Sequence, residues 1–217
     1  MRLKDKVCVV TGAGSGFGAG IAERFAREGA KIMVADINAD AKPFKVDVSN
    51  DDQVKDLKDA ALKAFGRIDI LVNNAGIAQV NQPMLEVDEA TFDRLFAVNV
   101  KSIYLTARHM VPHIIESQGN IINIASTGAV SPRVGITWYN GTKGAVMTLT
   151  KSMAMELAQK KVRVNAINPV FGDTGLTVDF MGGVDDPKIR EKFIATIPLG
   201  RISTPLDIAN AALFLAS

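Results

Sequence analysis

Residues 7 to 18 read VCVVTGAGSGFG and decide the fold of this chain. The apolar run at the start predicts a buried strand, in which Cys8 is a core residue rather than a nucleophile. The glycines allow a tight turn, and the pattern over about 16–28 predicts an amphipathic helix directly after it. A strand, a glycine turn and a helix in this order begin a βαβ unit, which builds a parallel sheet.

The rest of the chain repeats this alternation. Further strands are predicted at 31–36, 44–48, 68–73, 120–124 and 162–168, and helices at about 51–65, 88–116, 138–160 and 205–216, with Asp88 as the N-cap of the second of these helices. The pattern predicts an α/β fold: a doubly wound parallel sheet (Rossmann fold) in three α/β/α layers. Residues 1–217 form a single predicted domain. The glycine-rich stretch over about 171–198 breaks the rhythm and is predicted to be a mobile substrate lid.

Composition excludes several classes of function. The 217 residues carry 25 Lys and Arg against 23 Asp and Glu, and no basic run concentrates this charge as nucleic-acid binding requires. One cysteine excludes an intrachain disulfide. No segment reads as a signal peptide or a membrane span. We therefore expect a cytoplasmic protein that binds neither nucleic acid nor membrane.

The glycine turn and an acidic residue after it predict a dinucleotide site. The helix that follows the turn offers free backbone N–H groups to a pyrophosphate, although an ordinary strand-to-helix turn has the same sequence pattern. Asp36 ends the second predicted strand, eighteen residues after Gly18. A carboxylate there accepts hydrogen bonds from ribose hydroxyls and repels a 2′-phosphate, and Ser15 stands where an arginine would favour that phosphate. The pattern predicts NAD(H) in preference to NADP(H), with a solvated strand-end aspartate as the alternative.

Tyr139 and Lys143 lie four residues apart in a predicted helix. They share one helical face, with Cβ atoms about 5–6 Å apart. A neighbouring ammonium stabilises a phenolate, so we expect Lys143 to lower the pKa of Tyr139 and suit it to acid/base catalysis. The same spacing also occurs in solvated helix pairs, so it is not decisive alone.

The motifs taken together resemble the short-chain dehydrogenase/reductase family, in particular its 3-oxoacyl-acyl-carrier-protein reductase-like members. They occur in the family's order over nearly the whole chain: TGxxxGxG at 11–18, NNAG at 73–76, Asn99, Ser126, and then Tyr139 and Lys143. The resemblance implies that Tyr139 is the general acid/base, that Ser126 hydrogen-bonds the reacting oxygen, and that Lys143 tunes Tyr139 and holds the nicotinamide ribose. It also implies that Asn99 holds a water that relays protons to Lys143.

The resemblance also implies a set of cofactor-binding residues, which runs from the glycine turn to the stretch after the sixth strand. The set is Gly12, Ser15, Gly16, Phe17, Gly18, Asp36, Asp47, Val48, Asn74, Ala75, Gly76, Tyr139, Lys143, Pro169, Val170 and Thr174, with Asn73 beside it. The family usually has glycine where this chain has Val170.

These observations predict an NAD(H)-dependent oxidoreductase that interconverts a secondary alcohol and a ketone, with a 3-oxoacyl, sugar or cyclic-alcohol substrate. The alternative is a catalytically silent NAD(H)-binding protein that senses redox state or acts as a scaffold. A homodimer or homotetramer is expected. Candidates for an apolar substrate wall are Trp138, Phe171, Phe180 and Met181, with ordinary packing as the alternative. His109 and His113 lie four apart but lack a third ligand nearby, so no metal site is predicted.

The chain departs from the family in one crossover and at its end. Only residues 37–42 separate Asp36 from Pro43, and six extended residues span at most about 20 Å. That length leaves no room for a crossover helix, so strand residues such as Ile32 and Val34 would be exposed, or residues 44–48 would pair in another way. We therefore expect further residues between about 39 and 43 and a final strand after Ser217, or else a genuine deletion.

Overall fold

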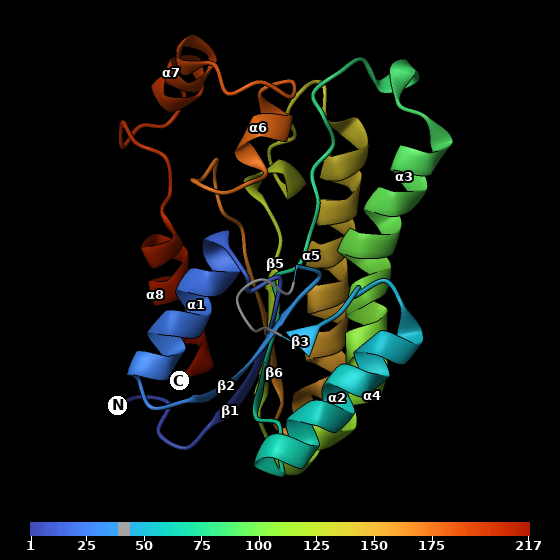
Figure 1. The fold of residues 1–217 in the computed structure, drawn as a ribbon, viewed down its shortest axis with the longest axis vertical. Helices are drawn as coiled ribbons and strands as arrows, with labels where there is room; N and C mark the ends of the chain where they lie inside the picture. The colour runs from blue at the N-terminus through green and yellow to red at the C-terminus, as the bar shows by residue number, and fades with distance from the viewer. Residues whose placement is uncertain (39–43) are drawn as a thin grey trace.

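The computed structural model describes residues 1–38 and 44–217, and these contain one six-stranded sheet (Figure 1). The strands lie in the order β3-β2-β1-β4-β5-β6, and every neighbouring pair is parallel. Their bounds are β1 Val7–Thr11, β2 Lys31–Asp36, β3 Phe44–Lys45, β4 Ile70–Asn73, β5 Asn120–Ile124 and β6 Arg163–Ile167. The order reverses between β1 and β4, as in a doubly wound fold.

Helices cover both faces of the sheet and make three layers, as the alternation of the sequence predicted. Figure 1 shows α1 (Gly16–Arg27) and α8 (Pro205–Ala216) on one side of the sheet, and α2 (Asp51–Phe65), α4 (Ser102–Ser117) and α5 (Thr137–Leu157) on the other. The remaining helices are α3 (Glu89–Phe96), α6 (Thr177–Phe180) and α7 (Pro187–Ala195).

The central strands carry apolar side chains toward both layers. In β4, Leu71 packs in the core beneath α2 and α4, while Ile70 and Val72 pack in the core beneath α1 and α8. A parallel sheet covered on both faces requires such continuous apolar strands. This is why the runs in the sequence identify the strands without strict alternation.

The predicted helix over 88–116 forms, and it contains one π-helical segment. Asp88 caps α3 as expected, because its carboxylate accepts a 2.7 Å hydrogen bond from the backbone of Thr91. A π-helical segment, Ala97–Lys101, then separates α3 from α4. Asn99 lies in that segment, and π-helical turns of this kind often occur at functional sites.

The connection from β2 to β3 differs from what the length of residues 37–42 led us to expect. β3 has two residues, and these pair only with Ala35 and Asp36 at the carboxyl end of β2. The chain does not have to return along the whole of β2, so the assumption behind the reach argument was wrong. The predicted strand over 44–48 is correspondingly shortened. Ile32 and Val34 are partly buried against the core rather than exposed. The predicted extra residues between 39 and 43 fall outside the described part of the chain.

Within residues 1–38 and 44–217, no helix has the length and apolarity needed to cross a lipid bilayer. The predicted lid over 171–198 contains the short helices α6 and α7 and irregular chain between them. Its mobility stays a prediction.

Candidate active site

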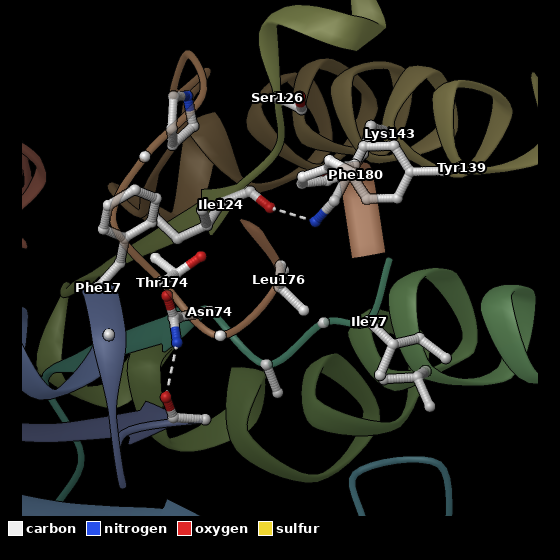
Figure 2. Close-up of a pocket in the computed structure, with 18 of the residues that line it drawn as sticks. Phe17, Asn74, Ile77, Ile124, Ser126, Tyr139, Lys143, Thr174, Leu176 and Phe180 are labelled. Carbon is white, nitrogen blue, oxygen red and sulfur yellow. Dashed lines mark hydrogen bonds between the residues drawn. The ribbon is translucent and has the colours of Figure 1, made fainter. Parts of the chain in front are cut away.

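A cavity of about 780 Å³ opens at the carboxyl ends of the parallel strands. The glycine turn after β1, the ends of β2 and β4, the loop after β5, the start of α5 and the segment after β6 all line it. Figure 2 shows residues from these separate elements facing one another across it. Ligands of doubly wound folds bind at this edge of the sheet, beside the point where the strand order reverses.

The glycine turn is packed too tightly for side chains. A Cβ on Gly12, whose φ is +62°, would lie 2.7 Å from the Cα of Ala75. A Cβ on Gly18 would lie 2.2 Å from the carbonyl oxygen of Gly12. Asn74 fixes the turn to β4, because its Nδ2 donates 2.9 Å hydrogen bonds to the carbonyls of Thr11 and Gly12 (Figure 2). The glycines therefore bring the backbone, rather than side chains, to the cavity.

The cavity fits the pyrophosphate and adenosine ribose of a dinucleotide. Helix α1 begins at Gly16, the Ser15 side chain does not cap it, and its first turn has no acidic residue to repel an anion. The carboxylate of Asp36 accepts hydrogen bonds from the backbone of Gly14 at 2.8 Å and of Asn38 at 2.9 Å, which fix it at the cavity wall. These residues suit the cofactor that the sequence predicted.

Asp47 and Val48 line the cavity beyond Asp36, where the resemblance placed the adenine. Burial would raise the pKa of Asp47, but hydrogen bonds from Ser49 and Arg94 hold it below the usual value. The Arg94 guanidinium lies 3.2 Å from the Asp47 carboxylate. The two charges at this end of the cavity therefore form a pair.

Ser126, Tyr139 and Lys143 come together at the opposite end of the cavity. Tyr139 and Lys143 are each only 5% exposed, and the ammonium of Lys143 lies 5.8 Å from the centre of the Tyr139 ring. Lys143 donates a 2.9 Å hydrogen bond to the carbonyl of Ile124 at the end of β5 (Figure 2). The Ser126 hydroxyl lies close enough to Tyr139 to lower the pKa of its phenol.

Burial shifts the pKa of both groups. It raises the pKa of Tyr139 to about 12, although the neighbouring Ser126 hydroxyl acts in the opposite direction. It lowers the pKa of Lys143 to about 8. The expectation that Lys143 brings the pKa of Tyr139 below 10 is therefore wrong for this arrangement, because desolvation of the phenolate dominates. Tyr139 holds its proton at neutral pH and is suited to donate it.

Asn99 supports the site from behind the cavity wall. Its Nδ2 donates to the Ile77 carbonyl at 3.0 Å and to the Thr142 hydroxyl at 3.1 Å, while its Oδ1 accepts from the Ile77 backbone at 2.9 Å. A Cβ on Gly76 would lie 3.2 Å from Asn99 Oδ1 and 3.4 Å from Lys143 Nζ, so the two side chains approach the same glycine. The predicted water relay stays a prediction.

Most of the predicted site residues line the cavity, and three do not. Gly18 lies behind the glycine turn, and Asn99 lies behind the wall. Asn73 takes part in a buried chain of polar groups instead: it accepts from Thr106 and donates to Asn123, both at 2.9 Å. Its side chain therefore points into the protein and not into the cavity. Val170 does line the cavity with φ outside the positive region, so valine is compatible with the backbone there.

Sequence reasoning missed Gln79, which is completely buried. Its Oε1 accepts hydrogen bonds from the backbone of Trp138 at 3.2 Å and of Tyr139 at 3.3 Å, and its Nε2 donates to the Gly135 carbonyl. The N-cap residue of α5 is Ile136, whose side chain has no acceptor. Gln79 thus caps α5, the helix that carries Tyr139 and Lys143, from a distant segment. A single glutamine outside any motif gave no signal of this role.

Two of the four candidates for an apolar substrate wall line the cavity, and their contact with a substrate stays a prediction. Phe171 and Phe180 line the cavity, joined by Phe193, which had not been singled out. Trp138 packs edge-on against Phe92 and donates to the Met84 carbonyl, outside the lining. Met181 is buried in the lid, also outside the lining.

The two histidines contact different carboxylates. His109 lies 2.8 Å from Asp51, and His113 lies 3.5 Å from Glu116. Among the described residues, no group of three His, Cys, Asp or Glu side chains is placed to hold a metal ion.

Comparison with known proteins identifies the family. Residues 12–217 match the family model described as "Enoyl-(Acyl carrier protein) reductase". The 3-ketoacyl-(acyl-carrier-protein) reductase from Brucella melitensis, solved in complex with NADH, superposes with a TM-score of 0.92 and 44% sequence identity, over 99% of this chain and 92% of that one. The chain belongs to the short-chain dehydrogenase/reductase family. It is an oxidoreductase of that family.

Curated relatives of this oxidoreductase carry several different substrate names. The 4-formylbenzenesulfonate dehydrogenase of Comamonas testosteroni is 43% identical over 233 residues, which cover all of this chain and 92% of the relative. The 3-oxoacyl-[acyl-carrier-protein] reductase of Thermotoga maritima is 36% identical with the same coverage. Both alignments are longer than the 217 residues of this chain, so these relatives contain segments without a counterpart here.

Proposed function

We propose that the protein interconverts a secondary alcohol and a ketone with NAD(H), using Tyr139 as the general acid/base. The observation that carries this proposal is the cluster of Ser126, Tyr139 and Lys143 in the same cavity as the glycine turn and Asp36. The NADH complex of the Brucella enzyme supports the choice of cofactor. The names of the relatives support the reaction class.

Each catalytic side chain has a distinct task in the reduction of a ketone. When bound, the reduced nicotinamide supplies the hydride that adds to the carbonyl carbon. Tyr139 donates its phenolic proton to the carbonyl oxygen, and Ser126 hydrogen-bonds the same oxygen. Lys143 holds an ammonium beside Tyr139 and stabilises the phenolate left behind. In the reverse direction, Tyr139 takes the proton from the alcohol.

The proposed preference for NAD(H) over NADP(H) rests on Asp36. Its carboxylate is held at the cavity wall by two backbone N–H groups. A 2′-phosphate beside it would place like charges together, whereas the two ribose hydroxyls of NAD would donate to it.

Oxidation of NADH in the presence of a panel of ketones tests the proposal. The panel contains a 3-oxoacyl thioester, a ketose and a cyclic ketone, each measured with NADH and with NADPH, with Tyr139→Phe as the control. Turnover of at least one ketone that Tyr139→Phe abolishes is the expected result. Binding of NADH without turnover of any ketone would favour a silent redox-sensing or scaffolding protein.

We also propose that the enzyme acts in the cytoplasm as a homodimer or homotetramer. Tyr104 on α4 and Met155 on α5 are 58% and 81% exposed, and both helices cover the same face of the sheet. Exposed apolar side chains of this size suit a subunit interface. Light scattering after size exclusion measures the mass of the assembly.

A further inference from the structure

Arg133 occupies the substrate side of the cavity and has no assigned role. It lies six residues before Tyr139, on the loop that leads into α5, and its side chain lines the cavity. Its guanidinium lies 5.8 Å from the centre of the Phe193 ring. Within the described residues, this guanidinium makes no hydrogen bond or ion pair.

A continuous aromatic wall connects the reacting tyrosine to Arg133. The Tyr139 ring meets Phe180 edge-on at 5.1 Å, and Phe180 lies 6.4 Å from Phe171. Phe171 in turn stacks on Phe193 at 4.4 Å with 7° between the planes. The wall therefore runs from the proton donor to a cation. Flat apolar molecules pack well on such surfaces.

The other charged side chains that line the cavity already have partners within the protein. Arg94 pairs with Asp47, and the Asp36 carboxylate accepts hydrogen bonds from the backbone of Gly14 and Asn38. Lys143 is buried at the reaction centre and donates to Ile124. Arg133 is thus the one lining cation whose partner is not found among the described residues. The cation–π contact with Phe193 also positions the guanidinium, whose planar shape suits two-point recognition of an oxyanion.

We propose that the substrate is an anionic aromatic ketone or alcohol whose carboxylate, or an equivalent oxyanion, pairs with Arg133 while its ring packs on Phe171 and Phe180. The inference rests on the proposed function for the identity of the reacting group. It adds the substrate class and makes Arg133 the residue that determines specificity. The oxyanion end and the carbonyl end would then bind at opposite ends of the aromatic wall.

Paired substrates that differ only in charge test the inference. Steady-state rates are measured for 4-acetylbenzoate and for 4′-methylacetophenone, with the wild type, Arg133→Met and Arg133→Lys. We expect wild-type kcat/KM to favour 4-acetylbenzoate by about tenfold to a hundredfold, the range for a hydrogen-bonded charge pair. Arg133→Met should remove this preference by raising KM for the acid, with a much smaller effect on kcat/KM for the neutral ketone. Arg133→Lys should retain part of the preference.

Arg190→Met is the matched control, because Arg190 pairs with Asp185 and does not line the cavity. It removes one positive charge within residues 171–198 and should leave the preference intact. Equal rates for the two ketones in the wild type, or an equal loss in Arg190→Met, would overturn the role of Arg133. Melting temperature and NADH affinity, measured for each variant, report whether folding and the cofactor site are preserved.

A binding measurement separates this inference from the proposed function. Calorimetry with NAD⁺-loaded enzyme compares 4-isopropylbenzoate with 4-isopropylbenzamide, neither of which can react. At least tenfold tighter binding of the benzoate, lost in Arg133→Met, supports the inference even if no ketone is turned over and the proposed function fails. Equal binding of the two, or equal binding to wild type and Arg133→Met, overturns the inference even if ketones are reduced.

Discussion

Burial moves the pKa values of two neighbouring side chains in opposite directions. It raises that of Tyr139 to about 12 and lowers that of Lys143 to about 8. In each case the charged form loses hydration, so the neutral form gains. At neutral pH the pair therefore consists of a protonated phenol, which can donate its proton to a ketone, and an ammonium.

Replacing Tyr139 by phenylalanine removes the proton donor but little of the cofactor site. We expect kcat for ketone reduction to fall by about 10²–10⁴, the usual contribution of general acid catalysis. NADH affinity, measured by fluorescence, should stay within about threefold of wild type. Retention of more than a tenth of the wild-type rate would contradict the assignment.

Lys143 makes stability depend on pH. Its pKa is about 8 in the folded protein and 10.5 in the unfolded chain, so the folded state binds fewer protons between these values. Burial of the ammonium therefore lowers the free energy of unfolding by its full amount below pH 8. Above pH 8 this destabilisation decreases by about 1.4 kcal/mol per pH unit. Lys143→Met should therefore gain stability relative to wild type at pH 7, and this gain should shrink by pH 9.5. Urea unfolding at both pH values measures it, and a constant difference would argue against a depressed pKa.

Asp36 sets the proposed cofactor preference. Asp36→Ala removes the carboxylate that repels a 2′-phosphate and accepts from ribose hydroxyls. The ratio of kcat/KM for NADH to that for NADPH should fall by about tenfold or more, corresponding to roughly 1.4 kcal/mol or more. Comparable efficiencies for the two cofactors in the wild type would show that Asp36 does not discriminate.

At the scale of elements, the start of α5 depends on a segment nearly sixty residues earlier in the chain. Helix N-termini leave backbone N–H groups without intrahelical partners, and Ile136 cannot satisfy them. Gln79 does so through Trp138 and Tyr139. Because one of these N–H groups belongs to Tyr139, the cap also positions the proposed proton donor.

Substitution of Gln79 tests this coupling. Gln79→Leu should cost about 1–2 kcal/mol in unfolding free energy, as for loss of a cap. It should also lower kcat by about tenfold with KM for NADH unchanged, because Tyr139 is displaced while the cofactor site stays intact. Gln79→Glu keeps the accepting oxygens and should recover part of kcat. Equal kcat for both variants would mean that Gln79 is only a packing residue.

At the scale of the whole molecule, the parallel sheet places the carboxyl ends of its strands at one edge. The segment over 171–198 contributes Phe171, Phe180 and Phe193 to the cavity at that edge. A cofactor beneath this segment would restrict it. In hydrogen exchange, NADH should slow exchange across 171–198 and leave β5 unchanged, since β5 is buried on both faces. Unchanged exchange over 171–198 would argue against a lid.

The sequence by itself determined the local structure and the reaction class. Three features can be recognised from neighbouring residues alone: the apolar strands, the glycine turn, and the spacing of Tyr139 and Lys143. In any parallel sheet, the segments that follow the strands lie at the same edge. Ser126 was identified as a site residue through the resemblance to the family, because it stands at the family's position between the NNAG motif and Tyr139.

Only the tertiary structure decided how these residues are surrounded. The raised pKa of Tyr139 arises from burial by other segments, so helical spacing alone gave the wrong direction. The inward orientation of Asn73, the cap from Gln79 and the aromatic wall ending at Arg133 join residues far apart in the chain. Hydration and contact depend on which segments pack together, and a local pattern carries no information about that.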